Sequence, residues 1–140
     1  MFTGIIQAIG RIAAIEPGEK DIRLHIETGK LPLAGVSLGD SIATSGVCLT
    51  VTELTGNGFW ADVSPETLSL TTLGSKDVGD AVNLETSLTL QTALGGHLVS
   101  GHVDGVGEVE RIVDDARFWR VTIAAPEKLA RYIAMKGSIC

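Results

Sequence analysis

Residues 3–26 read TGIIQAIGRIAAIEPGEKDIRLHI, and this stretch contains the pattern that sets the fold. Ile5–Ile15 and Ile22–Glu27 are two runs rich in β-branched and aliphatic residues, and Glu16–Lys20 between them contains a proline and a glycine. Apolar runs of this length, separated by turn residues, are typical of two paired strands. The stretch therefore predicts an antiparallel hairpin.

The same pattern returns 97 residues later without a gap. When Thr3–Ala43 is laid against Ser100–Cys140, 7 of 41 positions are identical. A chance match of this composition gives roughly two or three identities. Any two strand-rich segments share some alternation, but the gapless register favours an internal duplication. The apolar positions that correspond are Ile6, Ile9, Ile12, Ile15 and Ile26 in the first stretch and Val103, Val106, Val109, Ile112 and Ile123 in the second.

The duplication divides the chain unequally. We expect a first barrel over residues 1–88, a linker over 89–97 and the first half of a second, homologous barrel over 98–140. Nothing in the sequence pairs with Ser45–Leu88, and a complete second copy would run to about residue 185. Because this alignment ends the chain in mid-strand, we expect a truncated or clipped form.

The remaining local signals are mostly those of strands. Two short helices are expected, one from Pro65 to about Leu70 behind a Ser64 cap and one after Pro126. Many short strands with few helices predict an all-β fold, either a small barrel or a sandwich. The further strands expected are Leu49–Leu54, Gly58–Val63, Ala81–Leu84 and Val103–Val113.

The composition excludes several classes of protein. The 140 residues carry a formal charge of −6, and 44% of them are hydrophobic, which is enough for a core. A net acidic chain without a basic run is a poor binder of nucleic acid or of anionic membranes. The sequence shows neither a membrane-spanning apolar run nor a signal peptide. Cys48 and Cys140 lack metal-type spacing, so a reduced cytoplasmic location is expected.

Cys48 and Thr50 are expected to share one face of a strand, because alternation puts Leu49 and Val51 on the other face. A thiol and a hydroxyl two residues apart can present together to a ligand. The alternative is a buried cysteine that acts as a small hydrophobic residue, and the residue type alone favours this alternative.

Two further polar groups each allow two interpretations. His97 and His102 lie in GGHLVSGH, where the glycines allow either close approach of the backbone to a ligand or the turns of a crossover between domains. Their spacing does not suit a zinc site. Asp62–Thr67 ends a strand and starts a helix, whose free N–H groups suit a polyol or the edge of a heterocycle. Plain helix capping is the alternative there.

Several motifs together resemble the riboflavin synthase family of the alpha-chain type, which is built from lumazine-binding barrels. The resemblance covers all 140 residues without a large gap. Its most specific parts are MFTGI at residues 1–5 and GGHLVSGHVDG at residues 95–105. The other matching motifs are GVCLTV at 46–51, ETL at 66–68, TLG at 72–74, VGD at 78–80 and VNLE at 82–85.

The resemblance implies a fold, an assembly and a reaction. The fold is a six-stranded Greek-key barrel with short helices, followed here by an incomplete second copy. The full-length family assembles as a homotrimer, and a truncated form is expected to be a dimer or a monomer. The reaction is a dismutation of two molecules of 6,7-dimethyl-8-ribityllumazine into riboflavin and 5-amino-6-ribitylamino-pyrimidinedione by transfer of a four-carbon unit. The resemblance implies no cofactor and no metal. Two related barrels facing each other would hold the two substrates close together, which is catalysis by proximity.

The resemblance also implies roles for individual residues. Cys48 is expected to be the nucleophile or to polarise the acceptor carbon, Ser41 and His102 are expected to transfer protons, and Phe2 is expected to stack on a substrate ring. Thr50 and His97 complete the candidate catalytic set. The substrate contacts in the first barrel are Gly4, Ile5, Ile6, Cys48, Leu49, Thr50, Asp62, Val63, Ser64, Pro65, Glu66 and Thr67. Those of the second barrel are Gly101, His102, Val103 and Lys136.

Two other functions stay open. Lumazine proteins of luminous bacteria have the same fold and duplication and bind lumazine or flavin without turnover, but they tend to lose the catalytic positions that this chain keeps. A 140-residue form is also expected to bind the small-molecule substrate but to turn it over poorly or not at all, because a site shared between two barrels would lack one wall. Neither nucleic acid nor a membrane is an expected partner.

Overall fold

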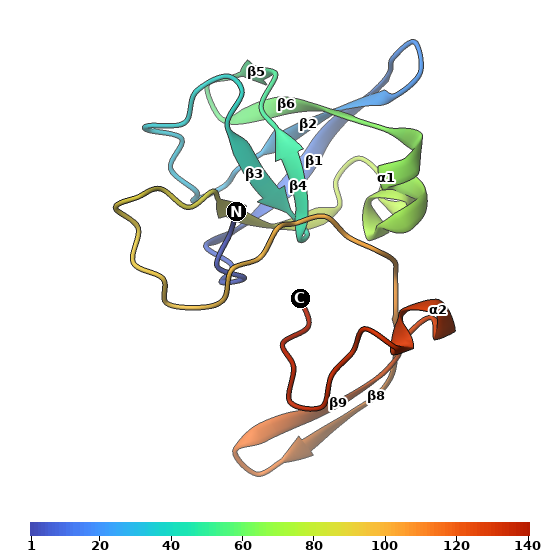
Figure 1. Cartoon of the computed structure of the whole chain (residues 1–140). Helices are drawn as coiled ribbons and strands as arrows, with labels where there is room; N and C mark the ends of the chain where they lie inside the picture. Colours follow the sequence, from blue (N-terminus) through green and yellow to red (C-terminus); the bar gives the residue numbers. More distant parts are fainter. The chain divides into compact units, whose positions relative to one another are not determined.

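The computed structural model describes all 140 residues, which fall into two compact units, Met1–Val103 with Cys140, and Asp104–Ile139. The first unit consists mainly of strands with short helical turns, which confirms the expected all-β class (Figure 1). No helix in either unit is long and apolar enough to cross a membrane. The elements of the first unit are β1 (Ala8–Pro17), β2 (Ile22–Glu27), β3 (Ser41–Thr44), β4 (Val47–Thr50), β5 (Glu53–Leu54), β6 (Gly58–Val63), α1 (Pro65–Leu70), the 3₁₀ turn η1 (Thr72–Ser75) and β7 (Ala81–Thr86).

The predicted first hairpin is formed by β1 and β2, which pair in antiparallel register. The pairing contains a β-bulge, because Ile12 lies opposite Ile26 while Ala14 lies opposite His25, so that Ala13 is skipped. A bulge bends its strand and increases the local twist, which helps a sheet to curl. Strand β1 continues along β7 and β2 continues along β6, so the hairpin forms the centre of the sheet.

The sheet closes because one stretch of chain takes part in both of its ends. The order of the strands is β4-β3-β7-β1-β2-β6-β5, and β4 and β5 are separated only by Val51 and Thr52. At this bend the Thr52 amide donates to the Trp60 carbonyl of β6, while the Val51 amide donates to the Asp40 carbonyl. When β4 and β5 are counted as two halves of one bent strand, the first unit is a closed barrel of six strands.

The core lies inside this barrel and is filled by aliphatic side chains from every wall. Alternation decides which side chains enter it, so β6 contributes Phe59, Ala61 and Val63, and Trp60 stays half-buried. Burial of one large apolar side chain contributes about 1.5–3 kcal/mol to folding. Other core members are Ile12, Leu24, Ile26, Ile42, Leu49, Val82 and Leu84.

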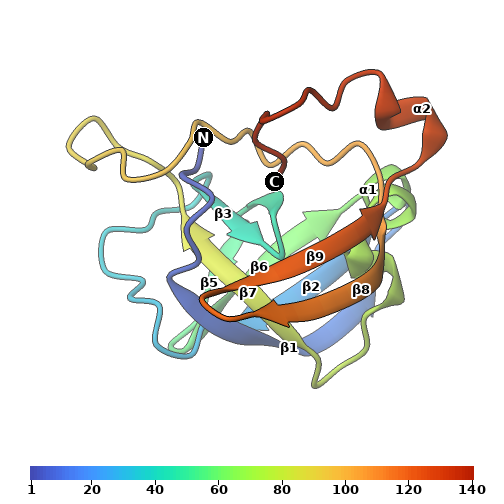
Figure 2. The same cartoon turned by 90° about the horizontal axis from the view of Figure 1, so that it is seen from below.

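The second unit contains one antiparallel hairpin and one short helix: β8 (Glu108–Asp115), β9 (Phe118–Ala124) and α2 (Glu127–Ala130) (Figure 2). Six of the seven residue pairs in this hairpin lie 97 residues after a pair in β1–β2. The bulge lies at the equivalent place, because Val109 faces Ile123 and Arg111 faces Thr122, which skips Glu110. The face that is buried in the first unit is exposed in the second, where Val121 and Ile123 lie about half-open to solvent.

Three expectations about elements need correction. The strand expected over Leu49–Leu54 is broken at Val51 and Thr52, because the chain there changes from one strand partner to another. The strand expected over Val103–Val113 begins only at Glu108. Residues 137–140, expected to lie in mid-strand, form no strand. Their equivalents in the first unit, in β3, are held between β4 and β7, and the second unit has no such neighbours.

The extent of the first compact unit does not by itself locate the start of the second copy. The continuous part of the first unit ends at Val103. The expected division into 1–88, 89–97 and 98–140 instead describes where two copies of one sequence pattern would meet, and a boundary of spatial contacts does not locate that point. That division stays a prediction.

Candidate functional site

Three of the predicted catalytic residues, Ser41, Cys48 and Thr50, lie on the outer face of the sheet formed by β4, β3 and β7. Leu49 of β4 points into the core, so its neighbours Cys48 and Thr50 point outward, as the alternation predicted. Thr50 lies directly opposite Ser41. Cys48 lies opposite Ala43, and Ala43 in turn lies opposite Glu85 of β7. Side chains of directly paired residues share one face. The result is a patch of two hydroxyls, one thiol and one carboxylate on the outside of the barrel.

The N-terminal segment lies against this outer face, and we call Met1–Ile6 the N-terminal strap. Phe2 exchanges two backbone hydrogen bonds with Val99, at 2.8 and 3.0 Å. The Leu88 amide donates to the Met1 carbonyl, and the His97 amide donates to the Thr3 carbonyl, both at 2.8 Å. Met1–Thr3, the first half of the strap, is therefore fixed by backbone hydrogen bonds to the chain that follows β7.

Phe2 occupies an unexpected position within the strap. Its side chain is 1% exposed, so the ring is packed inside the protein. The predicted stacking of this ring on a substrate would require the strap to move. Gly4, Ile5 and Ile6, by contrast, are all exposed, and Gly4 has a φ of +81°, a conformation that favours glycine. These three residues are the part of the strap that is open to a ligand.

Gly101 brings the GGHLVSGH motif onto the same patch. Its carbonyl accepts the backbone N–H of Cys48 at 2.9 Å. A Cβ at this position would lie 2.9 Å from the Cβ of Cys48 and 3.1 Å from the Phe2 ring, and φ here is +76°. Only glycine fits such a site without displacing its neighbours. The glycine that sequence reasoning assigned to the second copy thus packs on the thiol-bearing strand of the first.

The two histidines of this motif are more exposed to solvent than Cys48, which is half-buried. Both are exposed, and the His102 backbone N–H donates to Ser100 Oγ at 3.2 Å. The His97 backbone is the one tied to the strap, at Thr3. Val103 is half-buried and packs against the core of the first unit. Lys136 lies in the second unit, exposed, with a φ of +61°.

Glu85 is the residue of this patch that sequence reasoning missed as a functional group. It was quoted only as part of the VNLE motif, but its carboxylate is 2% exposed and accepts hydrogen bonds from the strap. In the sequence the one visible sign is that an acid directly follows the apolar Leu84, near the end of an expected strand. Alternation alone places such an acid on the solvent side and gives no reason to expect burial.

Asp62–Thr67 forms a separate group at the end of β6, and its hydrogen bonds are those of a capped helix. The Thr67 amide donates to Ser64 Oγ at 3.2 Å, and Pro65 occupies the first turn. Asp62 forms an ion pair with Arg23 at 3.4 Å. The Glu66 carboxylate is exposed and has no hydrogen-bond or ion-pair partner, so it is the group here that is free to meet a ligand. Val63 is a core residue.

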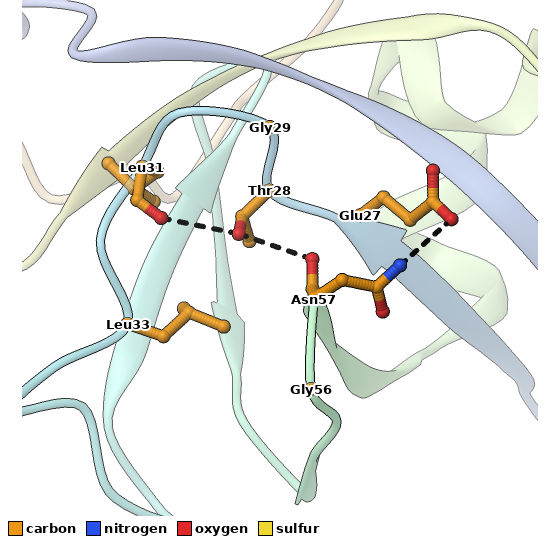
Figure 3. Close-up of a pocket in the computed structure, with 7 residues that line it drawn as sticks. All are labelled: Glu27, Thr28, Gly29, Leu31, Leu33, Gly56 and Asn57. Carbon is orange, nitrogen blue, oxygen red and sulfur yellow. Dashed lines mark hydrogen bonds between the residues drawn. The ribbon is translucent and has the colours of Figure 1, made fainter.

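An open cavity of about 410 Å³ lies elsewhere on the first unit, and none of the predicted site residues lines it. Figure 3 shows its lining, in which the Thr28 hydroxyl lies between the carbonyls of Leu31 and Asn57, at 3.3 and 3.4 Å. The Asn57 side chain donates to Glu27 at 3.1 Å. Its polar groups are thus used in joining two loops, which gives the cavity a structural role.

The closed six-stranded barrel with polar groups on its outer face places the chain among the small antiparallel β-barrel proteins. Within that class, the model of the lumazine binding domain matches residues 3–87 and 100–140. The chain therefore belongs to the lumazine binding domain family.

Relatives with curated names are similar over almost the whole chain. The riboflavin synthase of Photobacterium leiognathi is 48% identical over 139 residues, which are 99% of this chain and 64% of that protein. The riboflavin synthase of Brucella abortus is 46% identical over 144 residues, which are 99% of this chain and 71% of that protein. The chain thus spans about two thirds of the length of these relatives.

Solved structures give the same fold. LumP in complex with riboflavin matches with a TM-score of 0.79 at 29% identity, over 95% of this chain and 72% of LumP. LumP in complex with 6,7-dimethyl-8-(1'-D-ribityl) lumazine matches with a TM-score of 0.75 at 29% identity, over 91% and 70% of the two chains. The lumazine-binding barrel expected from the sequence is confirmed.

Proposed function

We propose that this chain is part of a riboflavin synthase, which converts two molecules of 6,7-dimethyl-8-ribityllumazine into riboflavin and 5-amino-6-ribitylamino-pyrimidinedione. The single observation that carries the proposal is the patch on β4, β3 and β7. There a thiol and two hydroxyls lie together beside an exposed glycine-containing strap. Riboflavin synthases at 40–48% identity support it.

We infer that the first unit binds one lumazine through backbone and side chains. Gly4–Ile6 of the strap and the Cys48–Thr50 segment, with the Cys48 and Thr50 side chains on the patch and Leu49 directed into the core, would hold the ring system. Asp62–Thr67 would hold the ribityl hydroxyls or the pyrimidine edge, with Glu66 as its free acceptor. Gly101–Val103 and Lys136 would belong to the corresponding site of the second copy. The Gly101 contact with Cys48 supports a role of that segment in shaping the first site as well.

The chemistry requires a base and an activated acceptor. The methyl group at C7 of the lumazine is acidic, because the carbanion formed on loss of its proton delocalises into the ring. Ser41 and His102 are the proposed proton carriers. Cys48 is the proposed nucleophile or polarising group for the second lumazine, and its half-buried position beside Thr50 keeps it within reach of a ligand on the patch. Thr50 and His97 complete the set.

We expect the 140-residue form to bind lumazine and to turn it over poorly or not at all. The reaction needs two substrates held face to face by two barrels, and the second unit contains one hairpin and one short helix. Full-length relatives are expected to assemble as homotrimers in which each site combines two barrels. Riboflavin formation by a mass-verified 140-residue protein would refute the expected loss of turnover.

Titration with 6,7-dimethyl-8-ribityllumazine, followed by ligand fluorescence, tests the proposal. Saturable binding is expected, and Thr67→Ala and Glu66→Ala should each weaken it about tenfold, since a hydrogen bond to a charged or oriented group is worth about 1.5 kcal/mol. Thr72→Ala and Glu19→Ala are matched controls, because both residues are exposed and lie outside the proposed site. Absence of binding at millimolar ligand would contradict the proposal.

A second function is favoured by one specific observation, the similarity to LumP in complex with riboflavin. A protein that binds lumazine or flavin without catalysis would give the same titration. The two functions differ in turnover by a longer form of the chain: an enzyme produces riboflavin and loses this activity on Cys48→Ser, whereas a binding protein shows no riboflavin emission with either sequence.

A further inference from the structure

Glu85 is a buried acidic residue whose carboxylate is held by hydrogen bonds. It lies near the end of β7, is 2% exposed, and takes no part in the ion pairs that Arg11, Arg23 and Arg120 form. Isolation of a carboxylate from water is costly unless hydrogen-bond donors replace the water. The structural question is therefore which groups supply those donors.

All donors to Glu85 come from the N-terminal strap. The backbone N–H and the hydroxyl of Thr3 both donate to Oε1 at 2.5 Å, and the backbone N–H of Gly4 donates to Oε2 at 3.1 Å. The Thr3 hydroxyl oxygen in turn accepts the Ile5 N–H at 3.1 Å. One carboxylate thus orients three successive amides, directly at Thr3 and Gly4 and through the hydroxyl at Ile5. Successive N–H groups of this kind form a concave anion-binding arrangement.

Glu85 also belongs to the row of side chains that contains Cys48. The two residues lie on either side of Ala43 in register, on the same outer face. Ala43 is buried although it points out of the barrel. The carboxylate therefore lies where the strap meets the catalytic patch. It accepts hydrogen bonds from Thr3 and Gly4 of the strap, whereas Val99 and His97 bind the strap through their backbones.

We propose that Glu85 is a positioning residue for the ligand site, and that its carboxylate fixes Gly4–Ile6 in the conformation that receives the lumazine. This inference rests on the proposed function. It gives Glu85 no contact with the substrate: the residue acts through the backbone of the strap. Loss of the charge should leave the barrel folded, because the core on the inner face is untouched.

The test compares Glu85→Gln with the unsubstituted 140-residue chain. The glutamine amide keeps the size of the side chain but presents an N–H₂ group where the strap needs an acceptor. We expect affinity for 6,7-dimethyl-8-ribityllumazine to fall at least tenfold. In a ¹⁵N-correlated NMR spectrum, the amide protons of Thr3 and Gly4 should move strongly upfield on loss of their charge-assisted bonds, while core amides stay in place.

A double-mutant cycle separates positioning from general stability. Thr3→Val removes the hydroxyl donor to Glu85 and leaves the backbone N–H donors of Thr3 and Gly4 in place. This variant therefore tests the same contact if Glu85→Gln fails to fold. If the two residues act as one clamp, the combined variant should bind little worse than Glu85→Gln alone. Glu19→Gln, an exposed acid far along the chain, is the control and should bind normally.

The outcomes distinguish this inference from the function on which it rests. Absence of lumazine binding by the unsubstituted chain would refute both. Normal binding by the unsubstituted chain and equal binding by a folded Glu85→Gln would overturn the positioning role alone. Strictly additive losses from Thr3→Val and Glu85→Gln would also overturn it, because independent effects do not describe a shared clamp.

Discussion

At the scale of single residues, two buried threonines show how hydrogen bonding decides whether a buried hydroxyl group raises or lowers the stability of the fold. Thr44 of β3 is fully buried and its Oγ1 has no hydrogen-bond partner. Thr28 is also buried, but its Oγ1 lies between two carbonyl oxygens. An unpaired buried polar atom carries a desolvation penalty that a paired one largely avoids.

Replacement of each threonine by valine, which has nearly the same shape, should therefore give opposite results. Thr44→Val should raise the free energy of unfolding by about 1 kcal/mol, and Thr28→Val should lower it by about 1 kcal/mol. Urea unfolding followed by tryptophan fluorescence measures both, and a Trp119→Phe background restricts the signal to Trp60 of the first unit. A loss of stability in Thr44→Val equal to that in Thr28→Val would contradict the argument.

At the scale of secondary-structure elements, the two hairpins have equal registers and unequal surroundings. Ile26 in β2 is 0% exposed, and its equivalent Ile123 in β9 is 54% exposed. Ile26→Ala should therefore cost about 2–5 kcal/mol of unfolding free energy, as for other core truncations. Ile123→Ala should change the stability of the first unit by less than about 0.5 kcal/mol. Similar losses in the two variants, measured by the same urea unfolding, would show that the face of β9 is covered in solution.

The elements also show what the sequence could and could not predict. The hairpin of β1 and β2, the strand β6 and the helix from Pro65 to Leu70 were predictable, because alternation and capping are local signals. Two features of β3–β5 were not. Strand β3, only four residues long, offers too short a pattern, and the bend at Val51 arises from a change of strand partner that only the closed barrel requires.

The candidate site was predictable to a similar extent. Alternation correctly put Cys48 and Thr50 on one face, but it could not show that Ser41 lies opposite Thr50, since that pairing depends on strand register. It also could not show the burial of Glu85 beneath the strap, or of Phe2 within the strap, because the strap is held by backbone bonds to residues 88–99. Hydrogen bonds between backbone groups of distant segments do not require particular residue types, so the sequence pattern does not predict them. The roles of these residues stay predictions, as does the duplication, which the shared register supports.

At the scale of the whole molecule, the two units differ in how their backbone is protected. The first unit is a closed barrel around a core, whereas β8 and β9 form a two-stranded ribbon, which is at best marginally stable alone in water. Amide hydrogen exchange should therefore be much slower in β2 than in β9.

We expect a difference of at least about a hundredfold between equivalent positions, since each 1.4 kcal/mol of opening free energy corresponds to a factor of ten. Exchange followed by NMR or mass spectrometry on the 140-residue chain measures it. The amides of β6 provide an internal reference for the closed barrel. Equal protection of β2 and β9 would mean that the second unit is stabilised in solution by further contacts.

The bulge that the two hairpins share bears on how ancient relationships within a chain can be recognised. Only 7 of 41 letters agree between the two stretches, and the skipped residue is an alanine in one and a glutamate in the other. The position of the bulge is nevertheless the same to the residue. Comparing the positions of bulges therefore detects a likeness between two hairpins that agree at few positions in sequence.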